Sequence, residues 1–322
     1  MYVGPGRRQI TCGYIQGNYI APEFLANIYA PISVVSRGLR MRTPSCHTFT
    51  SSLAPKLRRS TLHLRSQAPA SLLPNLVLRY ATLRKLSIIV EDVPHSSLVC
   101  PISEIVMQLE QIEDLSVPKL DRASFDQLPS LRKLCLGSGD VQDLYSARLS
   151  PSDTPHHHPF PALRTIDFAP SVQFEFIIEF LGLFSDCRMS DFYHFGVSIV
   201  TKSTMGSMYR ALAGHLSHTT LKNLHVKLVA APPVATLSEL ATLFCFRNLV
   251  DLSLSPAFGF NIDDSTAWDM ARAWPNLQSL NLEASTLFCH PSRMTLHGLR
   301  GFAQHCRGLK RLSVTFNAST VL

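Results

Sequence analysis

The chain has 322 residues, of which 46% are hydrophobic and 16% are charged. Such a composition supports a large buried core and excludes a wholly disordered protein. No run of 18 apolar residues occurs, so we expect no transmembrane helix. The first residues, MYVGPGRRQITCGY, lack the continuous apolar segment of a secretory signal.

The positive charge is concentrated at the start of the chain. Residues 1–90 contain twelve Lys or Arg residues and one acid, Glu23, so the rest of the chain carries −4 of the total charge of +7. Three interpretations are open: a nucleic-acid-binding patch, a mitochondrial presequence, and a small basic module beside an acidic repeat region. The arginines are scattered and are not clustered with aromatic residues, which argues against nucleic acid. We favour the basic module.

The first predicted element is a helical segment within residues 20–60, which follows a tail, residues 1–19, that we expect to be disordered. The segment begins with IAPEFLANIYAPI (20–32), where Leu25, Ile28 and Ile32 have the spacing of one apolar helix face. Together with SCHTFTSSLAPKL (45–57), this stretch resembles a degenerate F-box, a compact helical motif that presents an apolar surface to a partner.

The match to an F-box has clear departures. Ala21 stands where a proline is usual, Pro31 lies inside the expected helix, and no tryptophan follows Leu57. The resemblance implies a set of residues that contact the linker subunit of a ubiquitin ligase: Pro22, Leu25, Ile28, Tyr29 and Ile32.

A six-residue frame recurs through the remaining residues, 61–322. Three apolar residues are spaced three and then two apart, and the second step is the alternation of a strand with one buried face. The nine copies are LRKLSI (83), IEDLSV (112), LRKLCL (131), LRTIDF (163), FYHFGV (192), LKNLHV (221), LVDLSL (249), LQSLNL (277) and LKRLSV (309). Their starts are separated by 29, 19, 32, 29, 29, 28, 28 and 32 residues. This period is typical of a solenoid of leucine-rich repeats.

Apolar residues at helical spacing lie between most of these frames. The predicted helices cover residues 103–111, 173–184, 204–216, 236–244, 263–274 and 295–306. In the last helix we expect Leu296, Leu299, Phe302, Ala303 and Cys306 to share one buried face. In the repeat of 19 residues we expect a turn in place of the helix, and a local bend.

Strands that alternate with crossover helices run parallel and are joined by right-handed connections. The predicted fold is therefore an α/β leucine-rich-repeat solenoid, with a parallel β-sheet on the concave side and helices on the convex side. The chain stops about ten residues after its final frame, so we expect either an open strand edge there or a shortened gene product.

The last repeats also resemble a known group of proteins. FGFNIDDSTAWDMARAWPNLQSLNL and TLHGLRGFAQHCRGLKRLSV are similar to the final repeats of F-box/leucine-rich-repeat proteins abundant in mushroom-forming fungi. The resemblance covers roughly residues 20–320. It implies a cytoplasmic or nuclear substrate-recognition subunit of an SCF-type (cullin-RING) ubiquitin ligase, in which the F-box-like segment joins the linker and cullin subunits and the repeats hold a protein substrate. Two alternatives stay open: a repeat scaffold without a ligase role, and an organellar protein with a cleaved basic presequence.

The polar side chains between the buried residues of each frame form the surface that this architecture guarantees. Their mixed charge favours a protein or a small polar ligand over a phosphate backbone. The candidate partner-binding residues are Lys85, Asp114, Asp167, His194, Asn223, His225, Lys227, Asp251, Asn281, Glu283 and Arg311.

No motif predicts an enzyme, a metal site or a cofactor. The three histidines of TPHHHPFP are adjacent in a proline-flanked loop, and we interpret them as a solvated insertion. Cys289 and His290 are sequence neighbours, which rarely face each other as nucleophile and base do. Asp263 and Asp264 stand at the start of a predicted helix and are expected to stabilise its N-terminus. The eight cysteines form no C-x-x-C pair, which favours free thiols in a reducing compartment.

Overall fold

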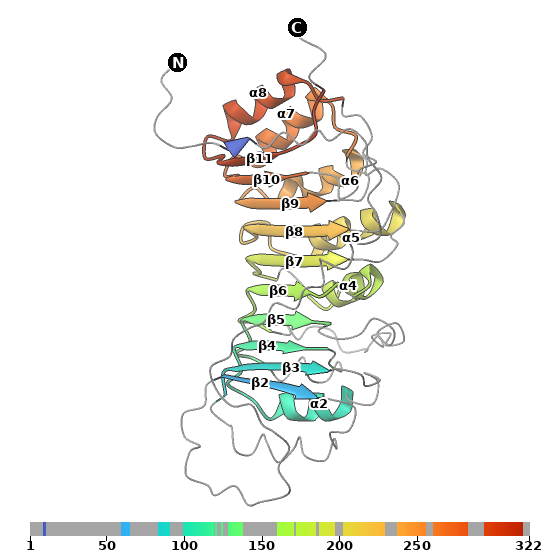
Figure 1. Ribbon diagram of the computed structural model, residues 1–322, viewed down its shortest axis with the longest axis vertical. Coiled ribbons are helices and arrows are strands. Elements are labelled where there is room, and N and C mark those ends of the chain that lie inside the picture. Colours follow the sequence, from blue (N-terminus) through green and yellow to red (C-terminus); the bar gives the residue numbers. More distant parts are fainter. Residues whose placement is uncertain are drawn as a thin grey trace, which may run out of the picture.

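The strands of the described part of the chain form one continuous parallel sheet (Figure 1). The structure is a computed structural model that describes residues 9–10, 59–64, 83–90, 99–118, 120, 124, 128–137, 160–170, 172–184, 187–196, 202–228, 237–255, 260–282 and 293–317. The strands are β1 (Gln9–Ile10), β2 (Arg59–Leu64), β3 (Lys85–Val90), β4 (Asp114–Val117), β5 (Lys133–Leu136), β6 (Thr165–Phe168), β7 (Asp191–Gly196), β8 (Asn223–Leu228), β9 (Asp251–Ser255), β10 (Ser279–Asn281) and β11 (Arg311–Ser313). They pair in the order β1-β11-β10-β9-β8-β7-β6-β5-β4-β3-β2.

The described helices connect β3 to β4 and each pair of consecutive strands from β6 to β11, and they lie to one side of the ladder (Figure 1). They are α2 (Val99–Met107), α4 (Phe174–Leu181), α5 (Lys202–His215), α6 (Leu237–Ala241) with the 3-10 helix η5 (Thr242–Cys245), α7 (Asp264–Ala273) and α8 (Leu296–His305). Neighbouring helices pack on one another, as α4 does on α5 and α7 on α8. The arrangement is the predicted α/β leucine-rich-repeat solenoid.

The apolar residues of each frame explain why the sheet forms. Leu249, Leu252 and Leu254 of the β9 frame are fully buried, and Leu252 pairs in register with Leu224 on one side and Leu280 on the other. Each fully buried leucine contributes about 1.5–3 kcal/mol of transfer free energy. A single repeat cannot bury these side chains, so each rung is stabilised by its neighbours.

The backbone bonds continue the ladder into the turn before each strand. The carbonyl of Arg84 accepts hydrogen bonds from the N–H groups of Glu113 and Asp114. The same pattern recurs in the later repeats, where for example the carbonyl of Gln278 accepts hydrogen bonds from the N–H groups of Lys310 and Arg311. One repeat of the sequence therefore corresponds to one step of the ladder.

The predicted frame of β7 is wrong by three residues. The buried positions are Met189, Phe192 and His194, because Phe192 pairs with Ile166 and with Leu224, the middle frame residues of the adjacent strands. The predicted frame began at Phe192 instead. His194 consequently takes the third apolar position and is buried, so the expectation that it faces a partner on the concave side is also wrong.

Two strands lie outside the nine predicted frames. β2 pairs with β3 along its whole length, so the ladder already includes Arg59. At the opposite end, β1 pairs in parallel with β11. The expected open edge at β11 is therefore occupied, in the described part of the chain, by residues from the start of the sequence.

The predicted helices are present, with corrections to the bounds of one helix and to one face. α2 spans Val99–Met107 instead of residues 103–111, and Leu109 beyond its end is buried. On α8, Leu296 is 53% exposed and Ala303 is exposed, whereas Gly298, Gly301 and Phe302 are buried. The reason is that α8 packs on α7 through its glycines.

Several predictions fall outside the described residues. These include the F-box-like positions Pro22, Leu25, Ile28, Tyr29 and Ile32, the histidine run at 156–158, the Cys289-His290 pair and most of the short repeat before β5. In the part of the chain that the structure describes, no helix has the length and apolar character needed to cross a membrane.

Candidate functional site

The strands present two rows of side chains on the face away from the helices. The strand register aligns the residues of each row across the sheet. The first row, from β3 to β11, is Lys85, Asp114, Lys133, Thr165, Asp191, Asn223, Asp251, Ser279 and Arg311. The second row is Ser87, Ser116, Cys135, Asp167, Tyr193, His225, Ser253, Asn281 and Ser313. Together these rows are called the concave rows.

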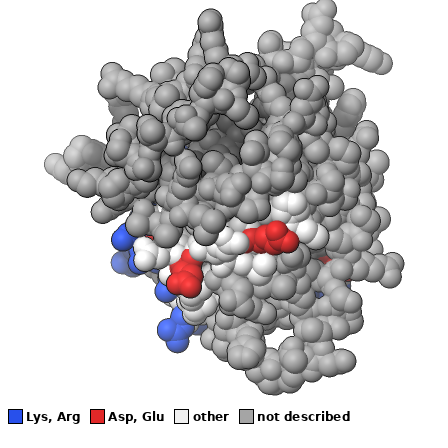
Figure 2. All heavy atoms as spheres, turned by 90° about the horizontal axis from the view of Figure 1, so that it is seen from below, with Lys and Arg blue, Asp and Glu red and all other residues white. Residues whose placement is uncertain are grey.

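The β3–β4 end of the concave rows is neutralised by ion pairs. Lys85 Nζ lies 2.8 Å from Asp114 Oδ2, and in the turns before these strands Arg84 Nη1 lies 2.7 Å from Glu113 Oε1. Viewed from the end that carries β2 and α2, the described surface shows both acidic and basic side chains (Figure 2). Such partly exposed pairs contribute about 0–1 kcal/mol each, and they leave little net charge for a partner.

The centre of the first row holds two oriented carboxylates. Asp191 accepts hydrogen bonds from Thr165 Oγ1, at 3.1 Å, and from the amide of Asn223. Asp251 Oδ1 lies 3.6 Å from His225 Nε2. The neighbouring His225 side chain lowers the pKa of Asp251, although partial burial opposes the shift. Hydrogen bonds thus hold the Asp191 carboxylate in place, and the lowered pKa of Asp251 favours its ionised form on the surface of the sheet.

The second row places aromatic surface beside these acids. The ring centroids of Tyr193 and His225 lie 5.0 Å apart. On the same pair of strands, Lys227 Nζ lies 5.2 Å from the centroid of the Phe195 ring. Burial, and then the nearby Asp191 carboxylate, raises the pKa of Tyr193, so its hydroxyl stays protonated and can donate a hydrogen bond. Aromatic residues with a polar end are common at the centres of protein interfaces.

Asp167 lies next to Tyr193 in the second row, and Cys135 lies on the other side of Asp167. Desolvation raises the pKa of Asp167, while Lys133 partly opposes the shift. Burial also raises the pKa of the Cys135 thiol, and Asp167 adds to the effect. A thiol with a raised pKa is a poor nucleophile, so Cys135 is suited to contact and not to covalent chemistry.

The structure places most of the predicted partner-binding residues on the concave face. Lys85, Asp114, Asp167, Asn223, His225, Lys227, Asp251, Asn281 and Arg311 all lie at solvent-facing strand positions. His194 does not, as described above, and Glu283 lies outside the described residues.

The sequence reasoning missed Asp191 and Tyr193, which lie at the centre of the face. Both belong to β7, where the frame was misplaced. A frame starting at Met189 follows Leu163 by 26 residues and precedes Leu221 by 32. That spacing is compatible with the repeat period. The frame is hard to recognise in the sequence because Met189 and His194 occupy two of its three apolar positions.

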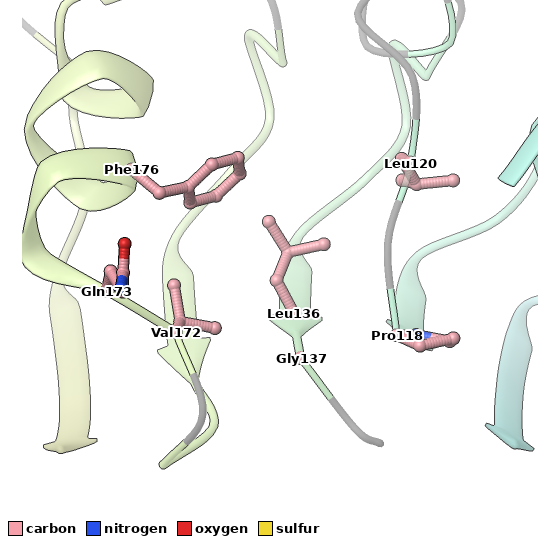
Figure 3. Close-up of a pocket in the computed structure, with 7 residues that line it drawn as sticks. All are labelled: Pro118, Leu120, Leu136, Gly137, Val172, Gln173 and Phe176. Carbon is pink, nitrogen blue, oxygen red and sulfur yellow. The ribbon is translucent and has the colours of Figure 1, made fainter. Parts of the chain in front are cut away.

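A recess also lies at the carboxyl ends of β4, β5 and β6, where Val172 and Phe176 point toward Leu136 (Figure 3). It is a shallow recess lined by Pro118, Leu120, Leu136, Gly137, Val172, Gln173 and Phe176. Among these described residues Gln173 is the single polar side chain, so the recess offers few groups that would orient a polar substrate. Among the described residues, no three His, Cys, Asp or Glu side chains are grouped to hold a metal ion.

No protein-family model matches the chain, and no curated protein matches it. Among solved structures, the chain is similar to the leucine-rich repeat-containing protein LegL7 from Legionella pneumophila, with 11% sequence identity and a TM-score of 0.37. The match covers 78% of this chain and 82% of that chain. Similarity at this level carries no argument about function.

Proposed function

We propose that this chain is a non-catalytic repeat protein whose concave rows bind a partner protein. The observation that carries the proposal is the centre of the face, where Tyr193, His225, Asp191 and Asp251 lie together on a rigid parallel sheet. A tyrosine and a histidine beside oriented carboxylates suit binding to another protein. Protein interfaces combine aromatic anchors with a polar surround.

A double substitution tests this site directly. Tyr193→Ala with His225→Ala removes the aromatic centre without touching a buried frame residue. In affinity purification of the tagged full chain, we expect the double variant to lose the proteins that the wild type holds on the concave rows, while linker and cullin subunits captured through residues 20–60 are retained. The control is Arg210→Ala with Arg300→Ala, two exposed positions on α5 and α8. Capture of the same proteins by wild type and both variants would contradict binding at the concave rows.

We further propose that the protein acts in the cytoplasm or nucleus as the substrate-recognition subunit of an SCF-type ubiquitin ligase. The support is the F-box-like sequence at residues 20–60 followed directly by leucine-rich repeats. In this role Pro22, Leu25, Ile28, Tyr29 and Ile32 contact the linker subunit, and the cullin joins through the linker.

The ligase role has its own test. Leu25→Asp with Ile28→Asp places charges on the proposed linker-binding face and is expected to abolish pull-down of the linker subunit. Linker binding that survives this change would count against the role, and no binding by the wild type would favour a repeat scaffold without ligase activity. Mass spectrometry that finds residues 1–60 removed from the mature protein would favour an organellar protein instead.

A further inference from the structure

The turns that lead into the strands bring scattered basic residues to one edge of the solenoid. Arg132, Arg164, Lys222 and Lys310 each stand directly before a strand, so they occupy the same position in β5, β6, β8 and β11. The turns before β7, β9 and β11 contribute three more arginines. The seven residues, all exposed, are called the basic edge: Arg132, Arg164, Arg188, Lys222, Arg247, Arg307 and Lys310.

Ladder hydrogen bonds fix this alignment. The N–H of Arg164 donates to the carbonyl of Arg132, and the N–H of Lys310 donates to the carbonyl of Gln278, its equivalent in the previous repeat. Arg164 Nη1 also donates to the carbonyl of Arg188, which brings the turns before β6 and β7 together. Adjacent strands lie about 4.8 Å apart, which is less than the screening length of about 8 Å at physiological salt. Neighbouring charges on the edge therefore reinforce one another.

The described turns of the basic edge contain no acid of their own. The described turn residues, 128–132, 160–164, 187–190, 216–222, 246–250, 274–278 and 306–310, contain no Asp or Glu. None of the seven basic residues forms an ion pair with another described residue. The turns before β3 and β4 differ, because there Arg84 is paired with Glu113. The uncompensated charge is thus confined to the edge from β5 to β11.

The composition of the edge indicates an anionic partner. Five of the seven residues are arginines, and the planar guanidinium group binds a carboxylate or a phosphate through two parallel hydrogen bonds. Both acidic protein segments and nucleic acids carry such groups, so the surroundings of the edge must decide between them.

Those surroundings favour a protein. Asp191 and Asp251 lie in the first concave row, directly beside the edge, and would repel a continuous phosphate backbone. The turn aromatics Phe184, Phe246 and Trp274 are buried, so they are not exposed for bases to stack on. A protein can place its acids on the edge and its other side chains on the concave rows.

We propose that the basic edge binds an acidic segment of the partner protein, rich in Asp and Glu, while the concave rows contact the rest of that partner. The proposal rests on the function proposed above in taking the partner to be a protein. The proposal predicts that the partner protein carries a segment rich in Asp and Glu.

The test measures binding of a labelled oligo-glutamate peptide to the full chain by fluorescence anisotropy, at low and at physiological ionic strength. The edge variant is Arg132→Glu with Arg164→Glu. The matched control is Arg210→Glu with Arg300→Glu, which changes the net charge equally but lies on α5 and α8. We expect the edge variant to bind about tenfold more weakly or worse, because two charge-assisted contacts become repulsive. The control is expected to stay close to the wild type, and Arg132→Gln with Arg164→Gln should lie between them.

Three results would overturn the inference. The first is wild-type protein that does not bind the peptide. The second is equal weakening in the edge and control variants, which would attribute binding to overall charge, including that of residues 1–90. The third is tighter binding of a single-stranded RNA of matched charge that also depends on Arg132 and Arg164. If capture of proteins still depends on Tyr193 and His225 in any of these cases, the proposed function stands and only the acidic segment is rejected.

Discussion

His194 occupies a position that the adjacent strands give to apolar residues. It pairs in register with Phe168 and Val226, and its ring lies edge-on to Phe174 with 4.9 Å between centroids. Neither ring nitrogen has a hydrogen-bond partner in the described part of the chain. Burial lowers the pKa of His194 from 6.5 to about 4. The Phe168 backbone acts to raise this pKa but does not offset the burial. The folded protein therefore holds this imidazole neutral.

The first prediction is that His194 makes the fold sensitive to mild acid. Its pKa is lower in the folded state, so the unfolded state binds the proton first and stability falls as the pH drops from about 6.5 toward 4. Between pH 7 and pH 5 the free energy of unfolding should fall by about 2 kcal/mol from this residue alone. His194→Leu should remove that loss, as measured by urea denaturation at each pH.

The control for this prediction is Leu296→Ala, at an exposed position on α8, which changes no titrating group and should leave the pH dependence unchanged. Asp251 has a lowered pKa and therefore stabilises the fold at every pH above the ordinary carboxyl range. That stabilisation is lost only when the pH falls through the carboxyl range, below the window in which His194 acts. The two contributions are thus separated in pH. Identical pH profiles for the wild type and His194→Leu would show that the imidazole is not buried neutral.

At the scale of the elements, two adjacent aspartates cap two different helices. Asp263 Oδ1 accepts a hydrogen bond from the N–H of Thr266, at 2.9 Å, and so caps α7. Asp264 accepts bonds from the N–H groups of Thr295, at 2.7 Å, and Gly298, at 2.9 Å, at the start of α8. Desolvation alone would raise the pKa of Asp264, but these bonds together lower it. The carboxylate thus links consecutive repeats.

The second prediction concerns that link. Asp264→Ala leaves the N–H groups of Thr295 and Gly298 without their acceptor and should lower the free energy of unfolding by about 1–2 kcal/mol. Asp269→Ala is the control, since this exposed acid on the same helix makes only a 3.5 Å pair with Arg272. Chemical denaturation of both variants checks the difference, and equal stabilities would mean that Asp264 does not cap α8.

The third prediction uses glycines that differ only in their surroundings. Alanine is usually more stable than glycine inside a helix, by up to about 1 kcal/mol. A Cβ at Gly298 would lie 2.6 Å from Met294 Cγ and 2.7 Å from Asp264 Oδ1, whereas a Cβ at Gly214 would have no atom within 4 Å. Gly298→Ala should therefore destabilise the protein by about 1–3 kcal/mol, and Gly214→Ala should stabilise it. Thermal denaturation decides, and two changes of the same sign would contradict the close packing of α7 on α8.

The frames made the ladder predictable because leucines such as Leu249, Leu252 and Leu254 fix which face of the strand is buried. The frame of β7 was not predictable in the same way, since Met189 and His194 replace two of its aliphatic residues. A second apolar triplet beginning at Phe192 competed with it. The strand register, a property of the neighbours, settles the choice.

The candidate site was partly predictable for the same reason. Where the frame was right, as at His225 and Asp251, alternation placed the polar residues on the correct face. Contacts between repeats were not predictable, because Asp264 and Thr295 are 31 residues apart and their bond depends on how α7 and α8 pack. The basic edge likewise emerges only when the turns are stacked.

At the scale of the whole molecule, each repeat is stabilised mainly by its two neighbours. Interior rungs have a buried neighbour on each side, as Leu252 does between Leu224 and Leu280. The rung at β11 is less protected, and Leu312 is only partly buried although it pairs with Leu280. The ladder should therefore be most stable in its middle and weaker at this end.

The last prediction follows from that gradient. Leu252→Ala should lower the free energy of unfolding by about 2–5 kcal/mol, because it leaves a cavity inside the core. Leu312→Ala should cost clearly less, since the partly exposed site can relax and water can reach it. Hydrogen exchange should rise in β8, β9 and β10 for the first variant, and in β10 and β11 for the second. Equal costs, or a uniform rise in exchange along the whole sheet, would mean that the solenoid unfolds as one unit without a weaker end.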